Sequence, residues 1–198
     1  MTYDKSDKFS ILKNLLITNR SVRRFDHSRA IQPSTVAELI DLTRYCASGR
    51  NLQPLRYRIV TDSAECADVY PHLAWAGYYK DWDGPDEKER PVAYLIQCLD
   101  TALCQNCLCD DGLQLEAITL GAASLGIAGC IIKAFNKQMI SEVLDIPARY
   151  EPRYVLALGY PAEKATIVDL GEDGDIKYYR DDASTQCVPK RPLSELII

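Results

Sequence analysis

Two groups of basic residues in this sequence could bind an anion. In the first group Arg20, Ser21 and Arg23 follow an apolar helical pattern. Guanidinium groups and a hydroxyl beside a helix end can hold a phosphate through forked, charge-assisted hydrogen bonds. The second group, Lys190 and Arg191, lies close to the C-terminal end and could reach the same anion if the tail folds back. Read alone, each run is usually an ordinary solvated loop.

A polar loop carries a further set of hydrogen-bonding groups. Ser48, Gly49, Asn51 and Gln53 lie between a predicted helix and a predicted strand. Their hydroxyl, their carboxamides and the flexible glycine are suited to the edge of a heteroaromatic ring or to a polyol chain. Asn and Gln are common in loops, so this pattern alone is weak evidence for a binding site. Its position relative to the other motifs along the chain is what makes it informative.

The composition requires any anion to be bound locally. The 198 residues are 47% hydrophobic and 26% charged, with a formal net charge of −5. An acidic chain of this kind is not attracted as a whole to nucleic acid or to an anionic membrane surface. We therefore expect one globular domain, residues 1–198, whose partners are small molecules.

The N-terminal residues 1–8 are polar, and the most apolar stretch, 112–129, contains Gln114, Glu116 and Thr119. These features predict neither a signal peptide nor a membrane span, and they favour a cytoplasmic protein. In that compartment the eight cysteines are expected to stay reduced.

Four of the cysteines, Cys98, Cys104, Cys107 and Cys109, lie within twelve residues. A zinc or iron–sulfur site is one interpretation, but their spacing does not match the usual ligand patterns. The simpler prediction is a set of reduced thiols at the start of a buried helix, with no bound metal.

Hydrophobic periodicity predicts an α+β domain. Helices are expected at 9–16, 35–46, 112–125 and 136–144, and strands at 57–60, 92–98 and 154–158. Thr35 and Glu38 predict a capping box at the start of the second helix. A C-terminal extension begins at about residue 162, and in it 167–170 and 176–179 are expected to form a hairpin.

Five segments, in this order along the chain, resemble the nitroreductase family of FMN-dependent oxidoreductases. They are Arg20–Phe25, Asn51–Pro54, Leu125–Cys130, Leu158–Pro161 and the basic pair Lys190–Arg191. The resemblance implies a central, mainly antiparallel or mixed sheet surrounded by helices. It also implies a homodimer with two FMN sites built from both chains, the C-terminal extension reaching the partner subunit.

The resemblance further implies cofactor-binding residues. Those expected at the FMN phosphate and ribityl chain are Arg20, Ser21, Arg23, Lys190 and Arg191. Those expected beside the ribityl chain and the ring are Ser48, Gly49, Asn51 and Gln53, with the backbone of Ala128 and Gly129 against the isoalloxazine. The sequence departs from the family pattern at Asn19, Leu55, Ile131 and Lys133, which concerns the substrate pocket more than the FMN site.

By the same resemblance, the reaction is a ping-pong transfer of reducing equivalents from NAD(P)H to a nitroaromatic, a quinone or a similar acceptor. No side chain is expected to act as a nucleophile or dedicated acid, while Lys133 or Arg50 could stabilise the anionic reduced flavin. The aromatic stretch from Trp75 to Trp82 could form a lid or a packed loop. A flavin-binding protein with little turnover, for storage or sensing, is the main alternative, and a thiolate metal-binding module is a weaker one.

Overall fold

The computed structural model describes residues 5–198, so that the first four residues of the polar N-terminal stretch lie outside the described part. Its helices are α1 (Lys5–Thr18), α2 (Pro33–Asp41), α3 (Ser63–Val69), α4 (Asp110–Ser124) and α5 (Lys137–Val143). Its strands are β1 (Leu55–Val60), β2 (Ala93–Asp100), β3 (Ala128–Ile132), β4 (Tyr150–Gly159), β5 (Ala165–Asp169), β6 (Tyr179–Arg180) and β7 (Gln186–Lys190). Among the described residues, no helix is both long and apolar enough to cross a membrane.

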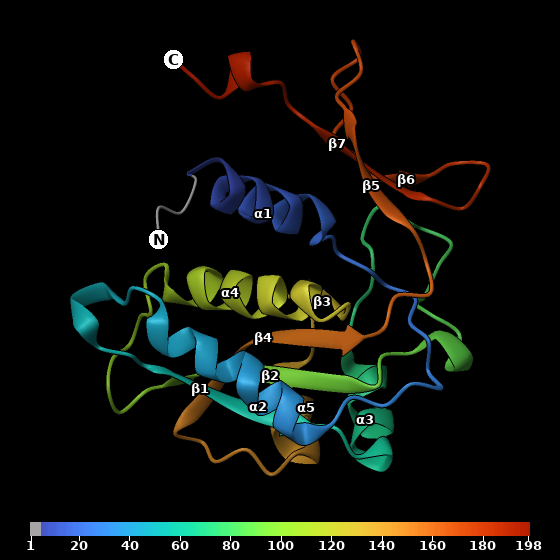
Figure 1. Ribbon diagram of the computed structural model, residues 1–198. Coiled ribbons are helices and arrows are strands. Elements are labelled where there is room, and N and C mark those ends of the chain that lie inside the picture. Colours follow the sequence, from blue (N-terminus) through green and yellow to red (C-terminus); the bar gives the residue numbers. More distant parts are fainter. Residues whose placement is uncertain (1–4) are drawn as a thin grey trace.

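The centre of the molecule is a four-stranded sheet with the order β1-β2-β4-β3 (Figure 1). Every neighbouring pair in it is antiparallel, which confirms the expected α+β class and the mainly antiparallel sheet. Strand β3 was not expected. It follows α4 after only three residues and continues the same apolar run, so that periodicity alone does not separate the two elements.

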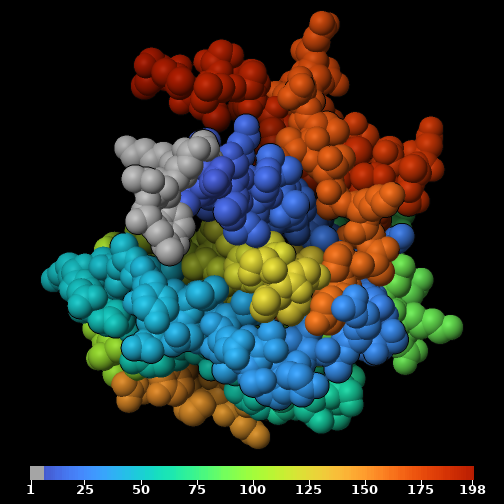
Figure 2. Space-filling view, in the orientation of Figure 1, coloured from blue at the N-terminus to red at the C-terminus, as the bar shows by residue number. Residues whose placement is uncertain are grey.

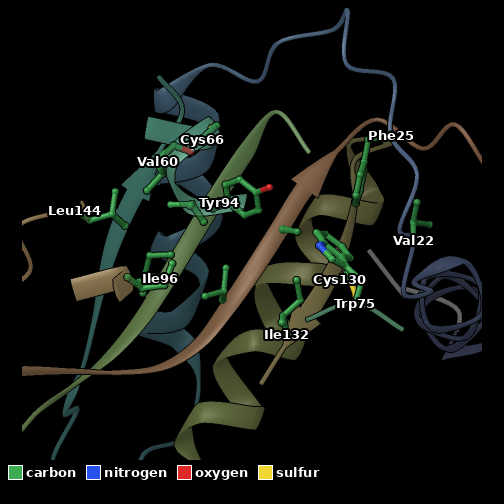
Figure 3. Close-up of a cluster of buried hydrophobic side chains, with 14 of the residues drawn as sticks. Val22, Phe25, Val60, Cys66, Trp75, Tyr94, Ile96, Cys130, Ile132 and Leu144 are labelled. Atoms are coloured by element: carbon green, nitrogen blue, oxygen red, sulfur yellow. Dashed lines mark hydrogen bonds between the residues drawn. The ribbon is translucent and has the colours of Figure 1, made fainter. Parts of the chain in front are cut away.

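Alternation along β2 divides the core into two layers. Tyr94, Ile96 and Cys98 pack in a cluster with residues of α3 and α5, part of which Figure 3 shows. Ala93 and Leu95 pack in the other cluster, with residues of α2 and α4. Successive strand side chains point to opposite faces, and here both faces are covered. The strand is therefore buried along its whole length.

Helix starts depend on local capping, and one of the two expected caps is wrong. Helix α2 begins at Pro33, after Gln32, and no side chain caps it. Proline suits a first helical position because its missing N–H would be unpaired there in any case. The helix therefore begins before Thr35, and the expected capping box does not start it. The expected cap of α5 is present, because the Asn136 side chain accepts a hydrogen bond from the Met139 amide at 3.1 Å.

The C-terminal region forms a second sheet with the order β5-β7-β6. The expected hairpin is wrong: β5 pairs in parallel with β7, and β6 pairs with the other edge of β7. Residues 181–185 turn the chain back, so the later strand enters between the two expected partners. Figure 2 shows the last residues, in red, at the periphery above the blue N-terminal helix. Contact of this extension with a partner subunit, like the single-domain organisation, stays a prediction.

A buried carboxylate joins β2 to the start of β4. Asp100 has a fully buried side chain and accepts two hydrogen bonds from Arg149, from Nε at 2.6 Å and from Nη2 at 2.8 Å. Arg56 of β1 lies 3.6 Å from the same carboxylate. This forked pair, supported by a second guanidinium, fixes the connection before β4 in place.

We expect the free energy of unfolding to fall as the pH is lowered below about 4. Hydrogen bonds from Arg149 lower the pKa of Asp100, and the bond from Lys137 lowers that of Glu151. Stabilisation from a depressed carboxylate pKa is complete above the unfolded value and is lost as the pH falls through the folded value. Urea titrations at several pH values measure the slope. Asp100→Asn should lower the free energy of unfolding at pH 7 and reduce its dependence on pH in the acid range. An unchanged pH dependence contradicts the assignment of this effect to Asp100.

Candidate functional site

The basic segment after α1 lies against two other motifs that are distant in sequence. Ser21 forms a parallel bridge with Gly129, and the Val22 amide donates to the Gly129 carbonyl oxygen at 3.1 Å. Phe25 forms an antiparallel bridge with Pro161. The structure thus brings together three of the five segments that carry the family resemblance.

Close packing around Phe25 holds this arrangement. The Phe25 side chain is fully buried. A Cβ atom at Gly159 would lie only 2.7 Å from the Phe25 ring, so a side chain there would displace the ring. The glycine at the end of β4 is therefore what allows the basic segment to approach the sheet.

A pocket of about 230 Å³ opens beside the segment, which we call the Arg20 pocket. Its walls come from the end of α1, the end of α4 with the start of β3, and the chain after β4. The lining residues are Thr18, Asn19, Arg20, Val22, Ala123, Gly126, Ile127, Ala128, Pro161, Glu163 and Ala165. Two of the expected site residues, Arg20 and Ala128, therefore line one concave site.

Arg20 has donor groups without protein acceptors. Its Nη2 donates to the Leu16 carbonyl at the end of α1, at 2.6 Å, but its buried Nε has no partner. Burial lowers the pKa of this guanidinium, and the Glu116 carboxylate partly opposes that effect. A buried donor without an acceptor is unfavourable, so the geometry fits an anion in the pocket.

Arg23 is 9% exposed, and its Nε is also buried without a partner. Its guanidinium lies 4.5 Å from the centroid of the Tyr178 ring. The Glu163 carboxylate accepts from the Arg23 amide at 2.6 Å and from Arg180 at 2.9 Å. Glu163 thereby orients the basic segment. Sequence reasoning missed it, because a single glutamate in a loop has no distinguishing pattern.

The aromatic segment from Trp75 to Trp82 is packed. Trp75 is buried, and Tyr79 contacts both Trp82 and Tyr178 edge to face. Arg180 lies over the Tyr79 and Trp82 rings at 4.9 and 5.0 Å from their centroids. These contacts favour the packed loop over the mobile lid, since the Tyr79 and Trp82 rings are partly buried against Tyr178 and Arg180.

The polar loop before β1 is organised by a carboxylate at the start of α4. Ser48 donates its hydroxyl to Asp110 at 2.6 Å, and the Gly49 amide donates to the same carboxylate at 2.9 Å. The Ser48 hydroxyl also accepts from the Gln53 amide at 2.9 Å. Asp110 is buried, and a carboxylate in a first helical turn is favoured by the helix dipole. Asp110 was not among the expected site residues.

Backbone strain is concentrated in this loop. Arg50, Asn51 and Gln53 have φ angles of 54°, 55° and 48°, in the left-handed region. Non-glycine residues rarely adopt this conformation, and it clusters at ligand sites where the surroundings enforce it. All three side chains are exposed and can therefore contact a ligand bound next to the loop.

One chain does not bring the expected site residues together. The Ser48–Gln53 loop lies at the start of α4, whereas the Arg20 pocket lies at its end (Figure 1). Helix α4 has 15 residues. At 1.5 Å per residue it separates the two groups by about 22 Å.

Arg23 follows the Arg20 pocket residue Val22 in the chain but does not itself line the pocket, and the other expected basic residues do not line it either. Lys190 ends β7 and is exposed, and Arg191 is paired with Glu195 at 2.6 Å. Lys133 donates to the Tyr154 hydroxyl at 2.9 Å. Within a single chain, none of these three residues lines the pocket that contains Arg20 and Ala128.

Two positions that depart from the family pattern have local partners. The Asn19 side chain donates to the Thr119 hydroxyl at 2.9 Å, which ties the end of α1 to α4. Leu55 is buried in β1 and packs with Leu99 and Cys107, away from the Arg20 pocket. Both residues therefore have structural roles in the chain itself.

The cysteine group gives no support to metal binding. Burial raises the pKa of Cys98 to about 12, and burial with the nearby Asp111 carboxylate raises that of Cys107. Neutral thiols are poor metal ligands. In the part of the chain that the structure describes, no three His, Cys, Asp or Glu residues are grouped so that they could hold a metal ion.

Comparison with known proteins agrees with the resemblance seen in the sequence. The model of the nitroreductase family matches residues 17–102 and 109–160. A curated relative, FMN reductase (NADPH) from Bacillus subtilis strain 168, is 28% identical over 99 residues. That match covers 49% of this chain but only 35% of the relative, so the chain spans about a third of the relative's length.

Solved structures share the fold. A nitroreductase family protein from Streptococcus pneumoniae TIGR4 has a TM-score of 0.67 at 18% identity, covering 94% of this chain and 98% of that chain. NADPH:FMN oxidoreductase from Vibrio harveyi, complexed with NAD+, has a TM-score of 0.64 at 19% identity, covering 87% and 80%. At these identities the likeness establishes the nitroreductase-type architecture of the chain.

The strained loop gives a prediction about stability. Gln53→Gly and Gln53→Ala both remove the side chain, but only glycine tolerates the positive φ without a steric penalty. We expect the glycine variant to be more stable than the alanine variant by about 1 kcal/mol, measured by urea unfolding. Equal stabilities, or a more stable alanine variant, would show that the loop is not strained at this position.

Proposed function

Because this chain belongs to the nitroreductase family, we propose that it is an FMN-dependent oxidoreductase that takes reducing equivalents from NAD(P)H. The observation that carries the proposal is the unpartnered, buried Nε of Arg20 in a pocket beside the backbone of Ala128. The Bacillus and Vibrio proteins, named as an NADPH-dependent FMN reductase and an NADPH:FMN oxidoreductase, support it as relatives.

In this proposal the basic segment holds the FMN phosphate. The unpaired N–H groups of Arg20 and Arg23 supply charge-assisted donors, and the exposed Ser21 adds a hydroxyl. Glu163 keeps the segment in place through the Arg23 amide, which leaves the guanidinium groups to the ligand. The donor set fits an anion, because the partly buried Arg20 guanidinium interacts more strongly with a negative charge than a fully solvated one would.

The start of β3 provides the surface for the flavin ring. The backbone at Gly129 is fixed by its bridge to Ser21, and Ala128 at the edge of the sheet presents little side chain. Bound FMN supplies the hydride and electron-transfer chemistry. The chain's own residues position the FMN, form the walls of the acceptor site and supply hydrogen bonds. No residue acts as a nucleophile.

The complete site needs two chains in this proposal. The polar Ser48–Gln53 loop and the Arg20 pocket lie at opposite ends of α4, and a two-fold axis across this helix places the loop of one chain beside the pocket of the other. Apolar residues that a dimer would cover are exposed, among them Phe9 on α1 at 69% and Leu196 in the C-terminal extension at 67%. Lys190 and Arg191 then reach the partner's phosphate.

The proposed electron acceptor is a nitroaromatic, a quinone or a similar flavin-reactive compound. The proposed location of the protein is the cytoplasm. Titration of the purified protein with NADPH in the absence of oxygen tests the reaction. We expect the yellow absorption of oxidised FMN at first, and its bleaching by about one equivalent of NADPH per flavin, restored by added quinone. Bound FMN that stays oxidised with both NADPH and NADH contradicts the oxidoreductase and supports flavin storage or sensing.

The phosphate assignment predicts the effect of two substitutions. Arg20→Ala and Arg23→Ala should each weaken FMN binding about tenfold to hundredfold, because each removes a charge-assisted hydrogen bond. Fluorescence titration of the flavin-free protein measures the dissociation constants. Arg58→Ala is the matched control, since Arg58 pairs with Glu65 and lies outside the Arg20 pocket. Unchanged FMN affinity in both site variants would overturn the assignment.

A further inference from the structure

A second pocket, of about 370 Å³, lies between the 27–30 segment, α3 and the chain entering β2. It shares no lining residue with the Arg20 pocket. We call it the Tyr94 pocket. Its volume is in the range of small-molecule sites, and the proposed flavin chemistry does not use it.

Tyr94 provides the first sign that this pocket binds a ligand. Its side chain is fully buried, yet its hydroxyl has no hydrogen-bond partner. Figure 3 shows the ring beside Cys66 and Val60 within the core. Burial raises the pKa of this hydroxyl far above its usual value, so the group is a neutral O–H that can donate. Buried polar groups in native proteins are usually paired, so this O–H is available to an acceptor that a ligand supplies.

Arg90 provides the second sign, independently. Its guanidinium lies over the Tyr70 ring, 3.9 Å from the centroid, and its Nε is buried without a partner. Among the described residues, no carboxylate oxygen forms an ion pair with it within 4.0 Å. A partly buried cation without a counter-ion favours an anionic ligand.

The rest of the lining restricts the ligand further. Ala30, Ala67 and Val92 supply apolar walls, whereas Glu87 is a negative group at the same pocket. Within the described part of the chain, Arg90 is the only arginine or lysine that lines this pocket. The proposed phosphate site combines Arg20 with Arg23, Lys190 and Arg191, so a singly charged anion suits the Tyr94 pocket better than a doubly charged phosphate. His27 is held by a 3.1 Å contact between its Nδ1 and the Arg90 carbonyl oxygen, which fixes the adjoining wall.

We propose that the Tyr94 pocket binds a small monocarboxylate with an apolar, ring-sized body, whose carboxylate accepts hydrogen bonds from the Tyr94 hydroxyl and the Arg90 guanidinium. The Tyr94 hydroxyl and the Arg90 Nε have no protein acceptor, so a ligand carboxylate can accept from both. This site is separate from the proposed FMN site and goes beyond the proposed function.

Calorimetric titration of the purified full chain with benzoate tests the proposal. We expect saturable binding that Tyr94→Phe and Arg90→Gln each weaken about tenfold or more, since each removes a hydrogen bond to a charged group. Benzamide, the uncharged analogue, should bind more weakly than benzoate. Tyr57→Phe is the matched control: its hydroxyl is bonded to Gln114 and it lies outside the pocket, so benzoate affinity should not change.

The stability of the variants distinguishes loss of the ligand site from loss of the fold. Tyr94→Phe should be as thermally stable as the wild type or more so, because it removes an unsatisfied buried hydroxyl. If it fails to fold, Arg90→Gln decides the outcome. No benzoate binding to the wild type, or binding that neither variant weakens, overturns the proposal. The visible flavin spectrum reports the FMN proposal separately, whatever the benzoate result.

Discussion

The length of α4 is the constraint on which the functional interpretation depends. The Ser48–Gln53 loop is tied to the first residue of the helix through Asp110, and the Arg20 pocket is built at its last turn. A rigid helix of 15 residues cannot bring its own ends together. Under the proposed function, the two groups meet at one cofactor only if a second chain supplies one of them, so the proposal makes dimerisation part of the site.

Around the Arg20 pocket, ordinary packing leaves arginine side chains without protein acceptors. Buried Phe25 anchors the basic segment against Gly159, and Glu163 holds its backbone. The Glu163 carboxylate thus accepts hydrogen bonds from backbone amides and from Arg180, while the Nε atoms of Arg20 and Arg23 have no partner. The same pattern, with Arg90 and Tyr94, recurs at the second pocket. At both pockets a ligand can supply the acceptors that these groups lack.

The sequence was sufficient for elements with strong local signals. Helix α4, the three longer strands and the Asn136 cap follow from periodicity and capping chemistry. It was insufficient where long-range pairing decides: β3 continues an apolar run, and β7 enters between two segments that look like a hairpin. For the site, Arg20 and Ala128 do line one pocket, whereas Glu163 and Asp110 carry no motif and become visible only through their partners.

A mixed dimer tests most directly whether two chains build each site. One chain carries Arg20→Ala with Arg23→Ala, and the other carries Asn51→Ala with Gln53→Ala; the two are co-expressed with different tags and purified together. If each site combines the basic segment of one chain with the loop of the other, the mixed dimer keeps one intact site and retains about one FMN per dimer, while both parent dimers lose FMN. A mixed dimer as empty of FMN as its parents would contradict the shared site.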